Sequence, residues 1–230
     1  AFPDPAEGSS DAVKVYRSIP RTLSEWKLFT GNGSNQDPAD GVLPYTLNTE
    51  LFADHASKHR FIRLPEGTSM TYMDHEVLEF PQGTLIVKTF SFPEKSGERL
   101  LETRIQEFGP NGWHGFSYQW NDEQTEAHLV LGGARTHGMS EGETYEIPNA
   151  NQCLSCHEQN GKFLPLGPTA RNLNRDGQLE RWAKAGALAG IPAHAEIPVL
   201  PVWNDSMTGS LDARARAWLD VNCAHCHNPV

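Results

Sequence analysis

The chain has 230 residues, 38% of them apolar and 20 of them glycine, which is typical of a globular protein with one large or two modest domains. Lys plus Arg number 19 against 29 Asp plus Glu, so the formal net charge is −10 at pH 7. A chain this acidic is a poor candidate for nucleic-acid binding, so we expect no nucleic-acid partner. No run approaches the ~18 apolar residues of a membrane-spanning helix, so we expect no membrane span.

Residues 1–148 are predicted to form a β-rich, sandwich-like domain. Apolar and polar residues alternate here in short stretches separated by Gly and Pro, which is typical of strands and turns. The expected strands are 61–64, 68–73, 84–92, 99–108, 112–120 and 125–131. In the third of these, Ile86, Lys88 and Phe90 share one face. A turn signal between the third and fourth strands predicts a hairpin over 84–108, and six short strands favour a sandwich or barrel.

All four cysteines lie in two C-x-x-C-H motifs, Cys153 to His157 and Cys223 to His227. This pattern is typical of haem c attachment, in which two thiols bond the vinyl groups of the porphyrin and the adjacent His binds the iron. We therefore predict two covalently bound haem c groups. The predicted attachment residues and proximal ligands are Cys153, Cys156 and His157 for one haem and Cys223, Cys226 and His227 for the other.

Three other interpretations of the cysteines compete with haem attachment. Two disulfides within the motifs would close strained, short loops and would not require a His after each second Cys. A zinc site with four thiolates usually has a shorter gap between its two C-x-x-C pairs. A thioredoxin-like motif would occur once and beside a βαβ pattern, which this sequence lacks.

Residues 149–230 are predicted to form a mainly helical, cytochrome c-like haem domain, so the expected fold class is α+β. The segment 210–222 carries apolar residues at helical spacing, with Ser210 as its N-cap, and leads directly into the second motif. The segment 179–188 is predicted to be a second, short helix. The domain boundary is placed at 147–149, where the alternation typical of strands stops.

The sequence resembles a family of exported dihaem c-type cytochromes of unassigned role, in which a β-rich N-terminal region precedes two haem motifs. The resemblance covers about residues 43–230. The matching stretches besides the motifs are 43–52, 60–65, 80–90, 102–104, 112–113, 118–121, 173–176 and 214–222. The resemblance implies export to the periplasm or beyond and electron transfer with redox partner proteins, but it implies no substrate. The first residues, Ala1 to Asp4, are compatible with the start of an exported mature chain.

Family members continue past the second motif, whereas this sequence ends at Val230. We therefore expect the haem domain to continue beyond Val230 and to supply the second iron with its distal ligand. The open alternatives are an upstream residue, a neighbouring subunit or water.

Met207 is the predicted distal ligand of the first iron. It follows the first motif and precedes the helix 210–222, which is the order expected of a His/Met cytochrome. The rival distal ligands are His194, His137 and Met139. His55 and His59 stand four apart, as a helical metal-binding pair would, but no third ligand matches their spacing.

Three classes of function follow from these features. The favoured class is an exported electron carrier, and the alternative is a peroxidase-like dihaem enzyme with an open distal site on one haem. The third class is a binding module that presents the aromatic residues of 113–120 to a partner. Such alternating aromatics more often form the core of a sandwich.

Overall fold

The computed structural model describes residues 19–95, 97–140, 142–159, 161–193 and 196–227. This part of the chain is β-rich, with 33% of residues in strands and 21% in helices. The strands are β1 (Val42–Pro44), β2 (Ser57–Arg63), β3 (Met70–Thr71), β4 (Leu85–Glu94), β5 (Gly97–Gly109), β6 (Gly112–Trp120), β7 (Ala127–Leu129), β8 (Ala134–His137), β9 (Thr144–Ile147), β10 (Glu158–Gln159), β11 (Lys162–Phe163) and β12 (Leu188–Ala189). The helices are η1 (Ser24–Trp26), α2 (Ala150–His157), α3 (Ala170–Leu173), α4 (Gln178–Lys184), η3 (Ser206–Thr208), α5 (Leu211–Asn222) and α6 (Ala224–His227).

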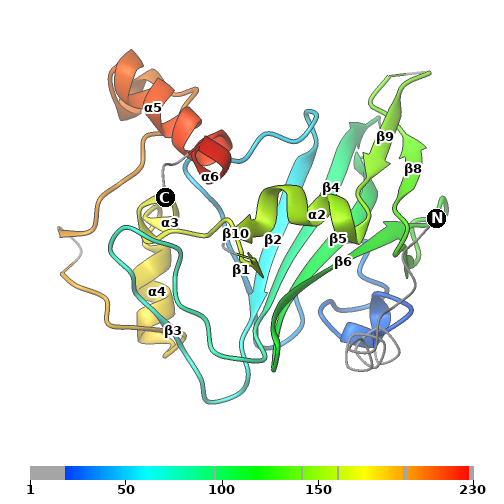
Figure 1. The fold of residues 1–230 in the computed structure, drawn as a ribbon, viewed down its shortest axis with the longest axis horizontal. Coiled ribbons are helices and arrows are strands. Elements are labelled where there is room, and N and C mark those ends of the chain that lie inside the picture. The colour runs from blue at the N-terminus through cyan, green and yellow to red at the C-terminus, as the bar shows by residue number, and fades with distance from the viewer. Residues whose placement is uncertain (1–18, 96, 141, 160, 194–195, 228–230) are drawn as a thin grey trace.

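The centre of the molecule is a six-stranded antiparallel sheet in the order β1-β2-β4-β5-β6-β7 (Figure 1). The predicted hairpin over 84–108 is confirmed, because β4 and β5 pair from Leu85↔Glu107 to Glu94↔Gly97. The predicted strand 112–120 coincides with β6, whereas the predicted strand 68–73 is reduced to the two residues of β3. Both faces of the sheet are buried at its centre, since the residues of β4 from Leu85 to Phe92 are buried except for the half-buried Lys88.

Different segments of the chain cover the two faces of the sheet. On one face, Val87 and Phe116 pack against Trp26 of the N-terminal segment. On the other face, Ile86 and Trp113 pack against residues of α3 and α4. The hairpin of β8 and β9 covers a third apolar cluster at one end of this second face. The aromatic residues of 113–120 are therefore buried in the core. They are not exposed to a partner, as the binding module would require.

The predicted fold class, a β-sandwich followed by a mainly helical cytochrome c-like domain, is wrong. The described residues contain one large sheet and three two-stranded pairings (β10–β11, β12–β3 and β8–β9) rather than two large sheets packed face to face. Beyond residue 148 the described helices span only three to twelve residues. The apolar residues of α3 and α4 are buried in one cluster with residues of the sheet, so these helices pack on the sheet and do not form a separate helical domain.

Residues from both sides of the predicted domain boundary share one hydrophobic cluster. Tyr45 and Ile62 belong to it together with Leu173 and Trp182. In addition, β12 pairs in parallel with β3, which ties a late segment of the chain to an early one. The boundary itself falls between β9 and α2.

The predicted helix 210–222 is confirmed as α5. The Ser210 hydroxyl accepts a hydrogen bond from the Ala213 backbone N–H at 3.2 Å, as an N-cap does. The predicted helix 179–188 is shorter than expected, because α4 ends at Lys184 and Gly186 adopts a left-handed conformation (φ 76°).

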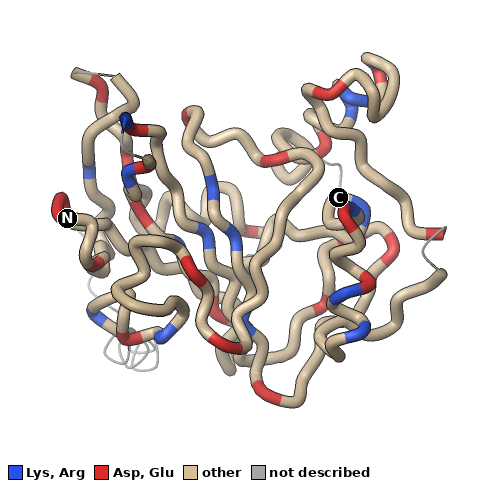
Figure 2. Tube along the Cα trace, turned by 180° about the vertical axis from the view of Figure 1, so that it is seen from behind, with Lys and Arg blue, Asp and Glu red and all other residues tan. Residues whose placement is uncertain are grey.

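Charged residues of both signs are interspersed along the chain, and basic positions lie side by side on the central strands β2, β4 and β5 (Figure 2). Among the described helices, none has the length and apolar character needed to cross a membrane.

Candidate functional site

The first C-x-x-C-H motif lies on helix α2, which crosses one face of the central sheet (Figure 1). Asn149 and Gln152 form a capping box at its start, with backbone-to-side-chain hydrogen bonds of 2.9 and 2.8 Å. Residues three and four apart lie on the same side of a helix. The motif spacing therefore places Cys153, Cys156 and His157 on one side of α2.

The imidazole of His157 is held by residues that the chain brings back beside it. The short hairpin of β10 and β11 follows α2 directly and returns the chain to the end of the helix. His157 Nδ1 lies 2.8 Å from the Leu164 carbonyl oxygen, and the Phe163 ring stacks on the imidazole with centroids 4.8 Å apart and planes 3° apart. Gly115 allows this arrangement, since a Cβ atom there would lie 3.0 Å from the Phe163 ring.

Gln106 of β5 approaches the same imidazole from the sheet. Its amide nitrogen lies 3.2 Å from both Nδ1 and Nε2 of His157. The lone pairs of the two ring nitrogens point in diverging directions, so one atom equally close to both lies over the face of the ring and in line with neither. The in-plane position at Nε2 therefore carries no hydrogen bond from Gln106.

The protonation of His157 suits an iron ligand. A carbonyl oxygen only accepts hydrogen bonds, so the contact with Leu164 assigns the proton to Nδ1. Burial lowers the pKa of His157 to about 4, which keeps the ring neutral at pH 7. Nε2 then has a free lone pair, and the hydrogen bond at Nδ1 orients the ring as outer-shell partners of metal-bound histidines do. The donor set of the first motif thus fits haem attachment.

The second motif begins where helix α5 ends. The Cys223 backbone N–H donates to the Leu219 carbonyl at 2.8 Å, and the short helix α6 then carries the remaining residues. Cys223 is partly buried, whereas Cys226 and His227 are exposed. The structure therefore shows partners for the imidazole of the first motif, but it shows none for His227 in the described part of the chain.

The two motifs, which are about seventy residues apart in the sequence, meet in space. Cys156 and Cys226 line the same cavity, and burial together with the neighbouring Cys226 thiol raises the pKa of the Cys156 thiol. Burial likewise raises the pKa of Cys153. All four cysteines are free thiols.

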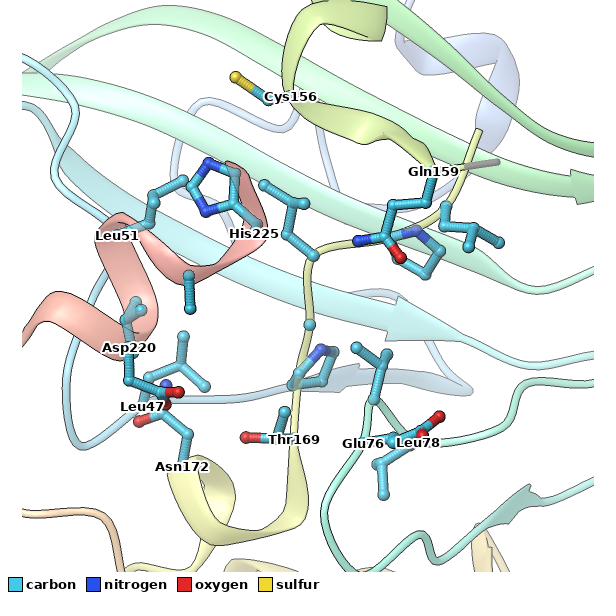
Figure 3. Close-up of a pocket in the computed structure, with 18 of the residues that line it drawn as sticks. Leu47, Leu51, Glu76, Leu78, Cys156, Gln159, Thr169, Asn172, Asp220 and His225 are labelled. Atoms are coloured by element: carbon cyan, nitrogen blue, oxygen red, sulfur yellow. The ribbon is translucent and has the colours of Figure 1, made fainter. Parts of the chain in front are cut away.

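A cavity of about 970 Å³ lies beside this meeting point. It is at the upper end of the range for small-molecule sites, ~300–1,000 Å³. Cys156 and His225 lie toward one end of it, and Thr169 and Asn172 toward the other (Figure 3). Its wall is mixed: apolar residues such as Trp113 alternate with charged ones.

Among the predicted distal ligands, the three that the structure describes, Met207, His137 and Met139, do not line this cavity. Met207 lies on η3 with 89% of its surface exposed, and Met139 is 47% exposed at the end of the β8–β9 hairpin, near the exposed His137. His194 lies outside the described residues, as do residues 1–4 and 228–230. Met207 as a ligand therefore stays a prediction.

The pair His55 and His59 does not lie on a helix. His55 sits in a turn with φ 62°, and its ring contacts Phe52 edge-on at 5.0 Å. His59 is on β2 and lies 2.6 Å from the Glu98 carboxylate. Within the described ranges, no group of three or more His, Cys, Asp or Glu side chains is arranged to hold a metal ion.

Three residues of the site were not predicted from the sequence: Gln106, Phe163 and Lys88. Gln106 and Phe163 contact His157 through pairing and a hairpin that have no local signature. Lys88 lines the cavity. The sequence did contain a signal for Lys88, because this lysine shares a strand face with the apolar residues Ile86 and Phe90.

No protein-family model matches the chain, and neither a curated protein nor a solved structure matches it.

Proposed function

We propose that this chain is an exported dihaem cytochrome c that carries electrons between redox partner proteins in the periplasm or outside the cell. The observation that carries the proposal is the first motif on α2. Its two thiols share one side of a helix with an imidazole that is neutral, oriented through Nδ1 and free at Nε2. The second motif repeats the same residue pattern and lies beside the first.

The chain's own residues would bind and orient the haems. Cys153 and Cys156 would attach one haem and His157 would ligate its iron, while the second motif would hold the other haem. The haem, when bound, supplies an iron that stores one electron by changing between the ferric and ferrous states. The Leu164 carbonyl and the Phe163 ring would keep the imidazole in one orientation during this change, as a rigid outer shell does. Because Cys156 and Cys226 are neighbours, the two attachment edges would be adjacent.

A peroxidase-like dihaem enzyme is the second candidate. The cavity of about 970 Å³ beside the motifs favours it, because a small oxidant needs space next to an open iron. The two candidates differ in the number of protein ligands at each iron.

An absorption experiment separates the carrier from the enzyme. The matured protein is titrated with cyanide in the ferric state while the Soret band is recorded. A carrier with two protein ligands at each iron is expected to show no rapid change, and it is expected to turn over peroxide slowly. Rapid cyanide binding at one haem together with fast peroxide turnover would contradict the carrier and support the enzyme.

Met207→Ala tests the predicted distal ligand. If Met207 ligates the first iron, the variant is expected to lose the near-infrared sulfur-to-iron band. The midpoint potential of that haem is expected to fall, because a thioether ligand raises the potential. Met73→Ala is the control, since it removes a partly exposed methionine that is not a predicted ligand. An unchanged band in Met207→Ala would assign the ligand to another residue.

A further inference from the structure

Three cations stand in a row across the middle of the central sheet. The strand register pairs Arg60 of β2 with Lys88 of β4, and Lys88 with Arg104 of β5 (Figure 2). Like charges directly opposite each other on neighbouring strands destabilise a sheet. The row therefore needs negative charge close to it.

The two outer cations have carboxylate partners. Arg60 pairs with Glu50 at 3.0 Å. Arg104 donates two hydrogen bonds to Glu102, at 2.9 and 2.6 Å. The carboxylates of Glu50 and Glu102 are thus engaged by the cations on either side of Lys88.

Lys88 has no such partner. No hydrogen bond or ion pair joins its ammonium to another residue in the described part of the chain, although Glu76, Glu79 and Glu158 line the same cavity. Burial, with the repulsion of Arg60 and Arg104, lowers the pKa of Lys88 to about 7. A cation held without a partner in such a place is costly.

The side chain is nevertheless reachable from the cavity. Lys88 is half-buried and lines the cavity wall. Ser155 and Cys156 of the first motif line the same cavity. The cavity therefore offers an anionic group a cation that no other residue neutralises, beside the first haem motif.

We infer that Lys88 binds a carboxylate group of a ligand that occupies this cavity. The carboxylate has two candidate sources: a propionate of the haem attached at α2, or a free small carboxylate. The first source rests on the proposed function, whereas the second does not. In both cases the anion completes the charge balance of the row, and the ammonium donates to it a charge-assisted hydrogen bond.

The binding test uses the full-length chain prepared without haem, with succinate as the probe and neutral succinamide as its size-matched control. We expect wild-type protein to bind succinate more tightly than succinamide in calorimetry. Lys88→Met is expected to weaken succinate binding about tenfold or more, since hydrogen bonds to charged groups contribute that much. Lys88→Arg is expected to retain binding. Lys184→Met, which removes an exposed lysine of α4, is expected to change nothing.

Folding of each variant is checked by circular dichroism, and Lys88→Gln replaces Lys88→Met if the latter fails to fold. Equal binding of succinate and succinamide by wild-type protein would overturn the inference. Equal succinate affinities of the Lys88→Met and Lys184→Met proteins would overturn it as well.

The haem-loaded protein distinguishes the two sources. If a propionate occupies the site, succinate no longer binds to it, and the propionate bands of the resonance Raman spectrum shift in Lys88→Met but not in Lys184→Met. If the ligand is a free carboxylate, succinate still binds to the haem-loaded protein. Should the chain take up no haem at all, the proposed function fails while the measurement on the haem-free chain still decides the role of Lys88.

Discussion

When matured in a host that attaches haem c, the chain is expected to have an intact mass greater than that of the polypeptide by two haem masses. Both motifs are complete, and no cysteine lies outside them. The haems should resist extraction by acidified acetone, because thioether bonds hold them. Intact-mass spectrometry measures the stoichiometry directly.

Removing the thiols of one motif should remove one haem and leave the other. The double variant Cys153→Ala/Cys156→Ala is expected to carry a single haem, and Ser155→Ala, between the same two cysteines, is expected to carry both. A wild-type mass that matches the bare chain, or the chain with zinc, would contradict the proposed function.

Glu102→Ala is expected to lower the free energy of unfolding by about 3 kcal/mol or more, because it breaks a buried ion pair. The Glu102 side chain is fully buried, while that of Arg104 is 34% exposed. Glu102 also accepts a hydrogen bond from the Tyr145 hydroxyl at 2.7 Å. Without it, Arg104 would join Lys88 as a second cation that lacks a carboxylate partner on this face of the sheet.

Urea unfolding of the haem-free chain measures this effect, and Glu146→Ala is its control. Glu146 pairs with Arg135 at 2.8 Å, but both side chains are largely exposed, so its loss should change stability by no more than about 1 kcal/mol. Similar unfolding midpoints for the two variants would mean that the Glu102 pair stabilises the fold no more than a surface pair does.

The features that the sequence alone predicted correctly are those encoded by neighbouring residues. Helix α5 depends on apolar residues at helical spacing and on the hydroxyl of Ser210 three residues before the N–H that it caps. The β4–β5 hairpin depends on two alternating stretches around one turn. The C-x-x-C-H spacing, once on a helix, places its thiols and imidazole on one side.

The sequence did not show what the helices after residue 148 pack against, and the predicted fold class was wrong for that reason. An amphipathic pattern specifies that one side of a helix is buried, but it does not specify the surface that buries it. Here that surface is a sheet built from residues 42–129, and Trp182 packs with Ile62 and Ile86. Haem attachment at the two motifs stays a prediction from the local pattern.

Only the tertiary structure decided which residues surround the candidate site. Gln106 and His157 are 51 positions apart, and the neighbouring cysteines of the two motifs are further apart still. The row of Arg60, Lys88 and Arg104 exists because the strand register aligns three residues from three strands. Register depends on the burial of whole strand faces and on the lengths of the connecting turns. The burial of a strand face depends on contacts between residues far apart in the sequence, which no local pattern contains.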